Sequence, residues 1–343
     1  MSRVAVLAVD GGNSKTDLAL VEADGSVLAL VRGPLSSPQH LGVDGCLTVV
    51  GGLLAEAVHE AGLDDHDGQI AQVATLLMAG VDFPAEEDAL RSAVEQRGWA
   101  PDVHVDNDTF AVLRAGTERG WGVAVTCGAG INCVGVSPDG RHARFPALGA
   151  ISGDWGGGYD LGLAAVSAAA RSEDGRGPRT SLERAVPAYF GLKTPSNLAE
   201  AIHSGRLDQR RVIELAPLVL AEASDDAVAA EIVQHLASEV VALARVALTR
   251  LELTKQPVEV LLGGGVLQDI DGDLLEAIDA GLRETAPAIT VRPTASAAVV
   301  GAALLGLDRL GGDDTVQARL RAQLGSAFSQ LEGVATLADV FDP

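Results

Sequence analysis

Aromatic residues and cysteines are both scarce in this chain. Only 3% of its 343 residues are aromatic while 47% are hydrophobic, so the sequence predicts a globular core built mainly from aliphatic side chains. The three cysteines, Cys46, Cys127 and Cys133, are too few for a disulfide framework and match no zinc-ligand spacing. This cysteine usage predicts a protein of the reducing cytoplasm.

Basic residues are also few relative to acidic ones. The chain has 25 Lys and Arg against 47 Asp and Glu, a formal charge of −22. Nucleic acids and anionic membranes bind clustered basic side chains, so this balance argues against both partners. The longest apolar runs are shorter than a bilayer requires, and the first residues lead into a strand rather than a charged leader. We expect no nucleic-acid and no membrane partner, although a short basic loop could still bind a small phosphate ligand.

What the chain does have is a glycine-rich turn near its N-terminus. Apolar runs of strand length at 4–10 and 17–21 predict a β-hairpin, and its turn contains Gly11, Gly12, Asn13, Ser14, Lys15 and Thr16. Glycine lets the backbone approach a ligand closely, and an aspartate at the strand end, Asp10, can hold a metal ion or its water shell. The spacing is not that of a P-loop. On these residues alone, an ordinary hairpin turn with a solvated lysine remains open.

A second hairpin repeats this pattern later in the chain. A strand at 122–126 leads into a glycine turn at 127–132 and a return strand at 133–136. The length favours two domains, and the repeated hairpin suggests two similarly built lobes, each with a phosphate-facing turn. We expect an N-terminal lobe of residues 1–115 and a C-terminal lobe of residues 116–343, with a helix near 297–310 packing back on the first lobe.

Further elements alternate between short apolar strands and helical patterns. We expect strands at 25–31, 72–78, 103–105, 258–262 and 289–291, and helices at 43–62, 84–98, 109–116, 225–253 and 317–331. Glycine is dense again at 149–158 and at 263–265. Glycine turns and carboxylates at strand ends could converge on one cleft between the lobes, which chemically resembles a nucleotide site.

Taken in order, these motifs resemble the family of N-acetylglucosamine kinases and benzoyl-CoA reductase activator ATPases, within the sugar kinase, heat-shock chaperone and actin superfamily. The likeness runs from about residue 4 to residue 307 and rests on Asp10–Asp17, Asn107-Asp108, Thr126–Asn132, Gly153–Gly156, Gly175–Leu182, Leu215–Pro217 and Leu262–Val266. It implies an α/β, two-lobed, actin-like ATPase fold of ribonuclease H-like mixed sheets with flanking helices, closing around ATP and Mg²⁺.

The resemblance also implies roles for individual residues. Asp108 would be the general base and Asp10 would hold the metal. The sugar would be bound by Asn107, Asp108, Asn132, Asp154, Gly80 and Ser37. The nucleotide would be bound by Gly11, Gly12, Asn13, Ser14, Lys15, Thr16, Thr126, Gly128, Ala129, Gly130, Gly263, Gly264 and Gly265.

Several of these roles have structural alternatives. Asp10 could simply cap its turn. Asp108 stands at a helix start, where an N-cap aspartate is favoured anyway. Asp154 could form an Asx turn. The glycines at 263–265 could serve close packing of a strand on a helix.

The departures from the family pattern cluster on the sugar side. Trp155 replaces an acidic residue, Pro146-Ala147 replace a glycine pair, and Ser37 replaces an asparagine; in the second phosphate loop Ala129 and Ile131 replace hydroxyl residues. ATP is therefore the more secure inference. Because the acids are retained, we favour phosphorylation of the 6-hydroxyl of glucosamine, whose free amine is largely cationic, with N-acetylglucosamine as the alternative.

Two other function classes fit less well. An activator ATPase of a dehydratase or reductase holds an iron–sulfur cluster through cysteines at a dimer seam, but two of the three cysteines here lie in the second hairpin. A sugar-responsive regulator would carry a DNA-binding helix-turn-helix, and the acidic charge disfavours DNA. The expected partners are an amino sugar and ATP, with a homodimer left open.

Overall fold

The computed structural model describes residues 4–63 and 69–341, with side chains as far as residue 328. Its contacts group the chain into two compact units, Met1–Trp121 with Ser296–Pro343 as unit 1, and Gly122–Ala295 as unit 2. The sequence-based division had one boundary, at 115/116, and expected the helix near 297–310 to pack back on the first lobe. The segment from Ser296, which contains that helix, groups with unit 1 because its helices pack there.

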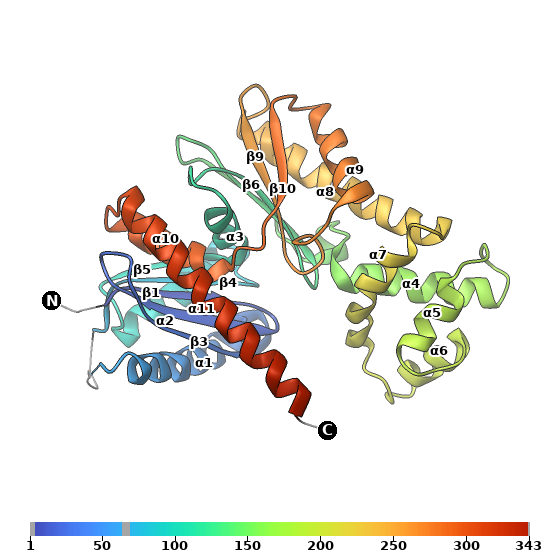
Figure 1. Cartoon of the computed structure of the whole chain (residues 1–343), viewed down its shortest axis with the longest axis horizontal. Coiled ribbons are helices and arrows are strands. Elements are labelled where there is room, and N and C mark those ends of the chain that lie inside the picture. The colour runs from blue at the N-terminus through green and yellow to red at the C-terminus, as the bar shows by residue number, and fades with distance from the viewer. Residues whose placement is uncertain (1–3, 64–68, 342–343) are drawn as a thin grey trace. The chain divides into compact units, whose positions relative to one another are not determined.

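Unit 1 is built on a mixed five-stranded sheet in the order β3-β2-β1-β4-β5 (Figure 1). Its strands are β1 (Val4–Gly11), β2 (Lys15–Val21), β3 (Val27–Pro34), β4 (Ala71–Met78) and β5 (Asp102–Asn107). β1 pairs antiparallel with β2 and parallel with β4, so it is the central strand. Residues 4–9 of β1 are all buried, as expected of a strand covered on both faces.

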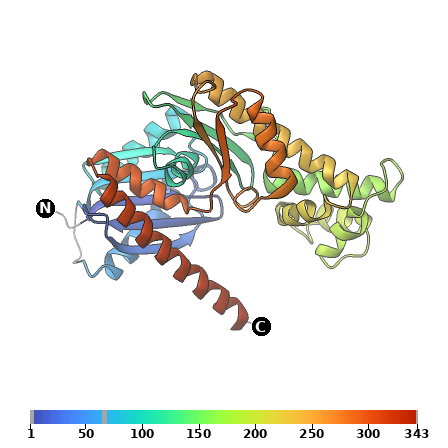
Figure 2. The ribbon, with the colours of Figure 1, turned by 45° about the horizontal axis from the view of Figure 1, so that its top comes forward.

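Helices cover both faces of this sheet. α1 (Pro38–Glu60) and α2 (Pro84–Arg97) pack over one face, where Leu53 of α1 lies against Gly33. α10 (Ala298–Arg309) packs on β1 and β4 and on α3 (Asp108–Gly116), and α11 (Asp314–Phe341) runs beside α10 and β3 (Figures 1 and 2). The approach of α10 depends on small residues, since a Cβ on Gly301 would lie 1.9 Å from the carbonyl oxygen of Ala111.

Unit 2 repeats the same sheet topology in the order β10-β9-β6-β7-β8. Its strands are β6 (Gly122–Cys127), β7 (Ile131–Val136), β8 (His142–Arg144), β9 (Val258–Gly263) and β10 (Ile289–Pro293). β6 pairs antiparallel with β7 and parallel with β9, as β1 does with β2 and β4. The predicted pair of similarly built hairpins is thereby confirmed, together with the two mixed sheets.

The helices of unit 2 form two groups. α8 (Ala227–Arg250) packs on β6, β7 and α9 (Gly272–Arg283). A separate apolar core lies among the shorter helices, which are α4 (Gly157–Glu173), α5 (Leu182–Tyr189), α6 (Pro195–His203), α7 (Ala216–Glu222) and the 3₁₀ helix η2 (Gln209–Leu215). A second 3₁₀ helix, η1 (Gly149–Ile151), precedes α4.

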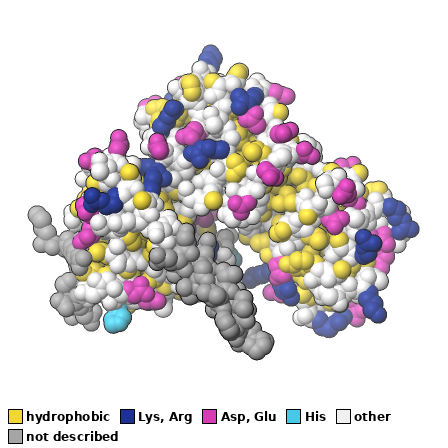
Figure 3. Space-filling view, viewed as in Figure 1, with side chains coloured by type: hydrophobic (Ala, Val, Ile, Leu, Met, Phe, Trp, Pro, Cys, Tyr) yellow, Lys and Arg dark blue, Asp and Glu magenta, His cyan; other side chains and the backbone are white. Residues whose placement is uncertain are grey.

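Two helices in the described part of the chain qualify the expectation that no segment could span a bilayer. By length and composition alone, α1 and α8 are long and apolar enough to cross a membrane. Each nevertheless packs apolar side chains inside its own unit: Leu47 and Val50 of α1, and Leu236 and Val240 of α8, are buried. Acidic and basic side chains are interspersed over the surface seen in Figure 3. The two helices are therefore well explained as core helices.

Candidate active site

The carboxyl ends of three parallel strands meet at one edge of the unit 1 sheet. Gly11 at the end of β1 is in register with Met78 of β4, which is in register with Asn107 of β5. This register brings Asp10, Gly80 and Asp108 to the same edge, where open α/β sheets bind their ligands.

The turn of the first hairpin divides into a structural part and an exposed part. Thr16 is fully buried, and its hydroxyl lies 2.7 Å from the carbonyl oxygen of Pro34 and 2.7 Å from Oγ of Ser36. A Cβ on Gly11 would lie 2.2 Å from the Met78 side chain, so packing requires that glycine. The exposed tip, Asn13 to Lys15, is closed by a 2.9 Å bond from the Gly12 N–H to the Lys15 carbonyl.

Asp108 is the first residue of α3 but is not its cap. Asn107 is the N-cap, and its Oδ1 accepts a 2.9 Å hydrogen bond from the Thr109 N–H. The alternative that Asp108 serves as the N-cap is therefore removed. Burial raises the pKa of Asp108 to about 6, so the carboxyl changes protonation just below neutral pH. A carboxylate with this pKa can act as a general base at pH 7.

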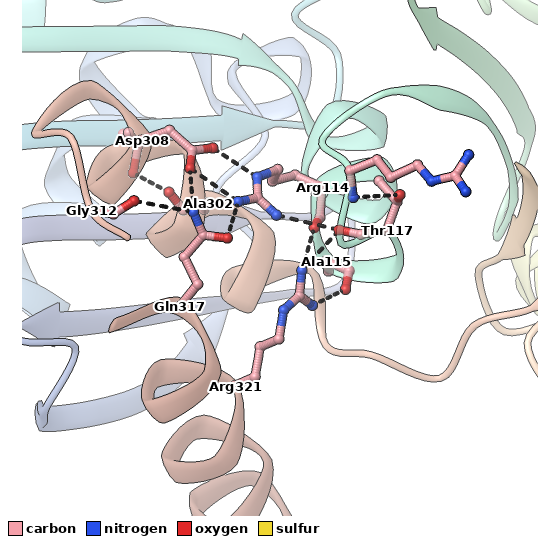
Figure 4. Close-up of polar contacts among 10 residues, drawn as sticks. Arg114, Ala115, Thr117, Ala302, Asp308, Gly312, Gln317 and Arg321 are labelled. Atoms are coloured by element: carbon pink, nitrogen blue, oxygen red, sulfur yellow. Dashed lines mark hydrogen bonds and ion pairs between the residues drawn. The ribbon is translucent and has the colours of Figure 1, made fainter. Parts of the chain in front are cut away.

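The C-terminal end of α3 is held by side chains from α10 and α11 (Figure 4). Arg321 donates hydrogen bonds to the carbonyl oxygens of Arg114 (3.1 Å), Ala115 and Thr117 (2.9 Å). The Arg114 guanidinium in turn donates to both carboxylate oxygens of Asp308, at 2.7 and 3.0 Å. These bonds satisfy carbonyl groups that a helix end leaves free, so the helix that carries Asp108 is fixed at both ends.

Asp10 lies among other carboxylates. Burial raises the pKa of Asp10 well above its ordinary value, the Asp108 and Asp17 carboxylates raise it further, and Lys15 and Arg32 lower it. Hard oxygen donors of this kind suit Mg²⁺, which keeps several waters and needs only one or two protein carboxylates. The described residues contain no group of three or more potential ligands, so such an ion would depend on Asp10 and its immediate neighbours.

A second group of residues borders this edge at the start of α1. Ser37 is fully buried, and its hydroxyl has no hydrogen-bond partner. Gly80, at φ +76°, lies close by: a Cβ there would be 3.1 Å from the Ser37 hydroxyl and 2.7 Å from Cβ of Gln39. Asp82 accepts a 2.8 Å hydrogen bond from the Asn107 amide. Sequence reasoning did not include Gln39 or Asp82, and only their proximity to Gly80 and Asn107 identifies them.

The second glycine turn, in unit 2, has an open tip. Neither Gly128 nor Gly130 has a positive φ, and a Cβ on either would meet nothing within 4 Å. Packing and backbone conformation therefore do not require glycine at these positions, whereas close approach of a ligand to the backbone would. Ala129 and Gly130 are exposed, and the Thr126 hydroxyl is buried with no hydrogen-bond partner.

The base of this turn is held by the first turn of α4. The N–H groups of Gly157, Gly158 and Tyr159 donate to Sγ of Cys127 and to the carbonyls of Gly128 and Ala129, at 3.1, 2.8 and 3.1 Å. These donors are used inside unit 2. The N–H groups at the exposed tip are then the better candidates for phosphate.

The glycines after β9 differ from one another. A Cβ on Gly264, which has φ +81°, would lie 2.5 Å from the Cys127 carbonyl oxygen, so packing and backbone conformation both require this glycine. Gly263 ends β9 in register with Thr126. A Cβ on Gly265 would meet nothing within 4 Å, so this glycine is free to face a flat ligand surface.

The remaining sugar-side candidates lie in unit 2. The Asn132 Oδ1 accepts a 2.7 Å hydrogen bond from the Cys133 N–H. The Asp154 carboxylate accepts from the Ser152 hydroxyl, and Trp155 stacks on His235 with ring centroids 4.0 Å apart. Trp155, which stands where the family pattern has an acid, thus orders its segment by stacking.

All three cysteines are buried inside their units, Cys46 on α1 and the other two on the β6–β7 hairpin. Burial raises the pKa of the Cys46 and Cys127 thiols to about 12, and it raises that of Cys133 as well. Iron–sulfur clusters are held by thiolates. These buried thiols are unsuited to that role.

The chain is similar to known proteins over most of its length. Residues 7–306 match the model of the BadF/BadG/BcrA/BcrD ATPase family. An N-acetylmuramic acid/N-acetylglucosamine kinase of Clostridium acetobutylicum is 28% identical over 268 residues, which cover 78% of this chain and 86% of that protein. An N-acetyl-D-glucosamine kinase of Dictyostelium discoideum is 26% identical, covering 90% of this chain and 99% of its own length.

A solved structure extends the likeness to three dimensions. A candidate N-acetylglucosamine kinase of Chromobacterium violaceum superposes with a TM-score of 0.68 at 26% identity, over 90% of this chain and all of that one. The two-lobed actin-like ATPase fold expected from the motifs is confirmed, as is the family resemblance on which it rested. The chain belongs to the BadF/BadG/BcrA/BcrD ATPase family.

Proposed function

We propose that this protein is an ATP-dependent hexosamine kinase that transfers the γ-phosphate of ATP to the 6-hydroxyl of glucosamine. The observation that carries the proposal is Asp108, which stands free of the capping role at the carboxyl edge of the unit 1 sheet with a pKa raised by burial to about 6. The names of the relatives support a kinase of amino sugars.

Phosphoryl transfer needs positioning, charge neutralisation and a group that accepts the proton of the attacking hydroxyl. At neutral pH Asp108 is mostly ionised, and its carboxylate takes the proton of the sugar 6-hydroxyl as that oxygen attacks the γ-phosphorus. The oxygen–γ-phosphorus bond forms, the bond to the β-phosphate oxygen breaks, and ADP leaves with that electron pair.

The phosphates are assigned to the two glycine turns. Lys15 supplies a cation from the exposed tip of the first turn, and backbone N–H groups at Ala129 and Gly130 supply donors from the second. Asp10 would hold Mg²⁺, directly or through its waters, with Asp17 beside it. When bound, Mg²⁺ neutralises charge on the phosphate oxygens.

The identity of the sugar rests on the charge at the unit 1 edge. Asp10 and Asp106 lie near the ends of β1 and β5, Asp108 directly follows β5, and Asp82 is bonded to the Asn107 amide. This excess of carboxylates favours a cationic amine. The names of the relatives favour the N-acetylated sugar as the second candidate. The unpartnered hydroxyl of Ser37 could bind either a hydroxyl or an acetamido group.

The test is ADP release measured with glucosamine, N-acetylglucosamine, N-acetylmuramic acid, glucose or no sugar, with the phosphorylated product identified by mass. The proposal predicts sugar-dependent release with the highest kcat/KM for glucosamine. A higher value for N-acetylglucosamine would retain the kinase and replace the substrate. Sugar-independent release would reject the kinase in favour of an ATPase.

A further inference from the structure

Three charged side chains form a row across the unit 1 sheet. Asp10 of β1 is the direct cross-strand partner of Asp17 of β2, and Asp17 is the direct partner of Arg32 of β3. Because direct partners point to the same face of a sheet, all three side chains lie on one face. It is the face of Val6, which packs against Gly306 of α10.

The outer two members of the row form a fixed pair. Nε and Nη2 of Arg32 donate to the two carboxylate oxygens of Asp17 at 2.6 and 3.1 Å. The Asp17 side chain is 4% exposed and that of Arg32 is 26% exposed. A two-pronged bond of this kind fixes the orientation of a carboxylate as well as neutralising it.

The Arg32 guanidinium also contacts the C-terminal helix α11. The buried ring of Phe328 in α11 lies with its centroid 5.1 Å from Cζ of Arg32. α11 is anchored over the same strands, because the Gln323 side chain accepts a 2.7 Å hydrogen bond from the Val27 N–H of β3. A cation over an aromatic face is attracted to it, so Arg32 is restrained from two sides.

We infer that Arg32 is a positioning residue for the proposed phosphoryl transfer, because it neutralises and orients Asp17 and so leaves Asp10 as the single carboxylate of the row that takes the divalent cation. Without Arg32, two adjacent carboxylates, the buried Asp17 and the half-buried Asp10, would face the cation together. Such a pair would bind the cation more tightly before the nucleotide arrives and would hold it away from the place where ATP needs it. This inference rests on the proposed function for its kinetic part only.

The test compares cation binding with catalysis. Mn²⁺ binding to the nucleotide-free protein is followed by electron paramagnetic resonance at one fixed pH for all variants. Arg32→Gln is expected to bind Mn²⁺ about tenfold tighter, as loss of one positive charge two strands away from a divalent ion would give, while kcat falls. A variant that merely loses structure would instead bind Mn²⁺ more weakly and also lose kcat.

Three further variants separate charge from geometry. Asp17→Asn in the Arg32→Gln background is expected to return Mn²⁺ affinity to the parental value, because it removes the uncompensated carboxylate. Arg32→Lys, which keeps the charge but not the two-pronged bond, is expected to keep parental Mn²⁺ affinity with a partial loss of kcat. Arg91→Gln, on the solvent-facing side of α2 beside Asp88, is the matched loss of one arginine and should change neither Mn²⁺ affinity nor kcat.

The inference is overturned if Arg32→Gln binds Mn²⁺ no more tightly than the parent, or if the double variant fails to reverse the change. Mn²⁺ binding does not depend on which sugar is phosphorylated. A parent protein without sugar-dependent ADP release would therefore reject the proposed function and leave the cation result to be judged separately.

Discussion

Asp108→Asn is expected to slow sugar phosphorylation strongly and at the same time to stabilise the folded protein at neutral pH. An aspartate in an unfolded chain has a pKa of about 3.9, whereas burial in the folded protein raises that of Asp108 to about 6. Folding therefore costs free energy whenever this carboxyl is ionised in both states. Each unit of difference corresponds to about 1.4 kcal/mol, so the gap of about two units sets an upper value of about 3 kcal/mol.

The sign of the pH dependence follows from the raised value. Between pH values of about 4 and 6 the folded state holds a proton that the unfolded state has lost, so the parent loses stability as pH rises through this window. Below it both states are protonated and the cost vanishes. Because the carboxyl is half-buried and retains some water, we expect Asp108→Asn to gain about 1–3 kcal/mol at pH 7 and almost nothing near pH 4.

The assay is urea unfolding of parent and variant at several pH values, beside the pH dependence of kcat/KM in the parent. The parental kcat/KM should fall about tenfold per pH unit below pH 6 and level off above it. Asp279→Asn, in an exposed pair with Arg283, serves as the control and should gain no stability. Equal stabilities of parent and Asp108→Asn at pH 7, or a kcat/KM that stays flat through pH 6, would show that burial does not raise the pKa of this carboxyl.

Other substitutions test the remaining parts of the site. Gly130→Ala adds a methyl group into open space, so it should leave the melting temperature unchanged and raise the KM for ATP severalfold. Gly264→Ala should instead destabilise the protein by about 2 kcal/mol or more, because its Cβ would meet the Cys127 carbonyl and its φ is +81°. Ser37→Ala removes a buried hydroxyl without a partner, so urea unfolding should show no loss of stability while the KM for the sugar changes. Arg321→Ala removes three hydrogen bonds to the end of α3, so it should lower the free energy of unfolding in urea by about 2–3 kcal/mol and also lower kcat. An unchanged kcat would show that α3 does not need this support.

Local patterns in the sequence predicted much of this fold. The two hairpins were predictable because a glycine turn between two apolar runs specifies a hairpin without reference to distant residues. Central strands such as β4 and β9 were predictable because strands buried on both faces are continuously apolar. β8 was not predicted, since its three residues at 142–144 are too few to show a pattern. α1 begins five residues before the expected start, because its first turn is separated from the rest of the helix by a kink at Gly42, where the backbone is not helical.

The site was only partly accessible from sequence. Asp10 and Asp108 were predicted as site residues from their motifs, but residues that support their surroundings lie far away in the chain. Nothing in the local sequence links Phe328 to Arg32, or Arg321 to α3, because those contacts exist only after α11 has folded over unit 1. α11 itself begins at Asp314 and extends to Phe341, beyond the helix expected at 317–331. The N-cap role of Asn107 also required coordinates, since two adjacent polar residues compete for that position.

Whether Asp108 activates a sugar hydroxyl for attack on ATP is tested most directly by the rate of glucosamine-dependent ADP formation. This rate is measured in the parent and in Asp108→Asn at saturating ATP and Mg²⁺. We expect glucosamine to stimulate the parent strongly, and the substitution to lower kcat by about 10²–10⁴ in a folded protein that still binds ATP. An Asp108→Asn protein that phosphorylates glucosamine at the parental rate would contradict it.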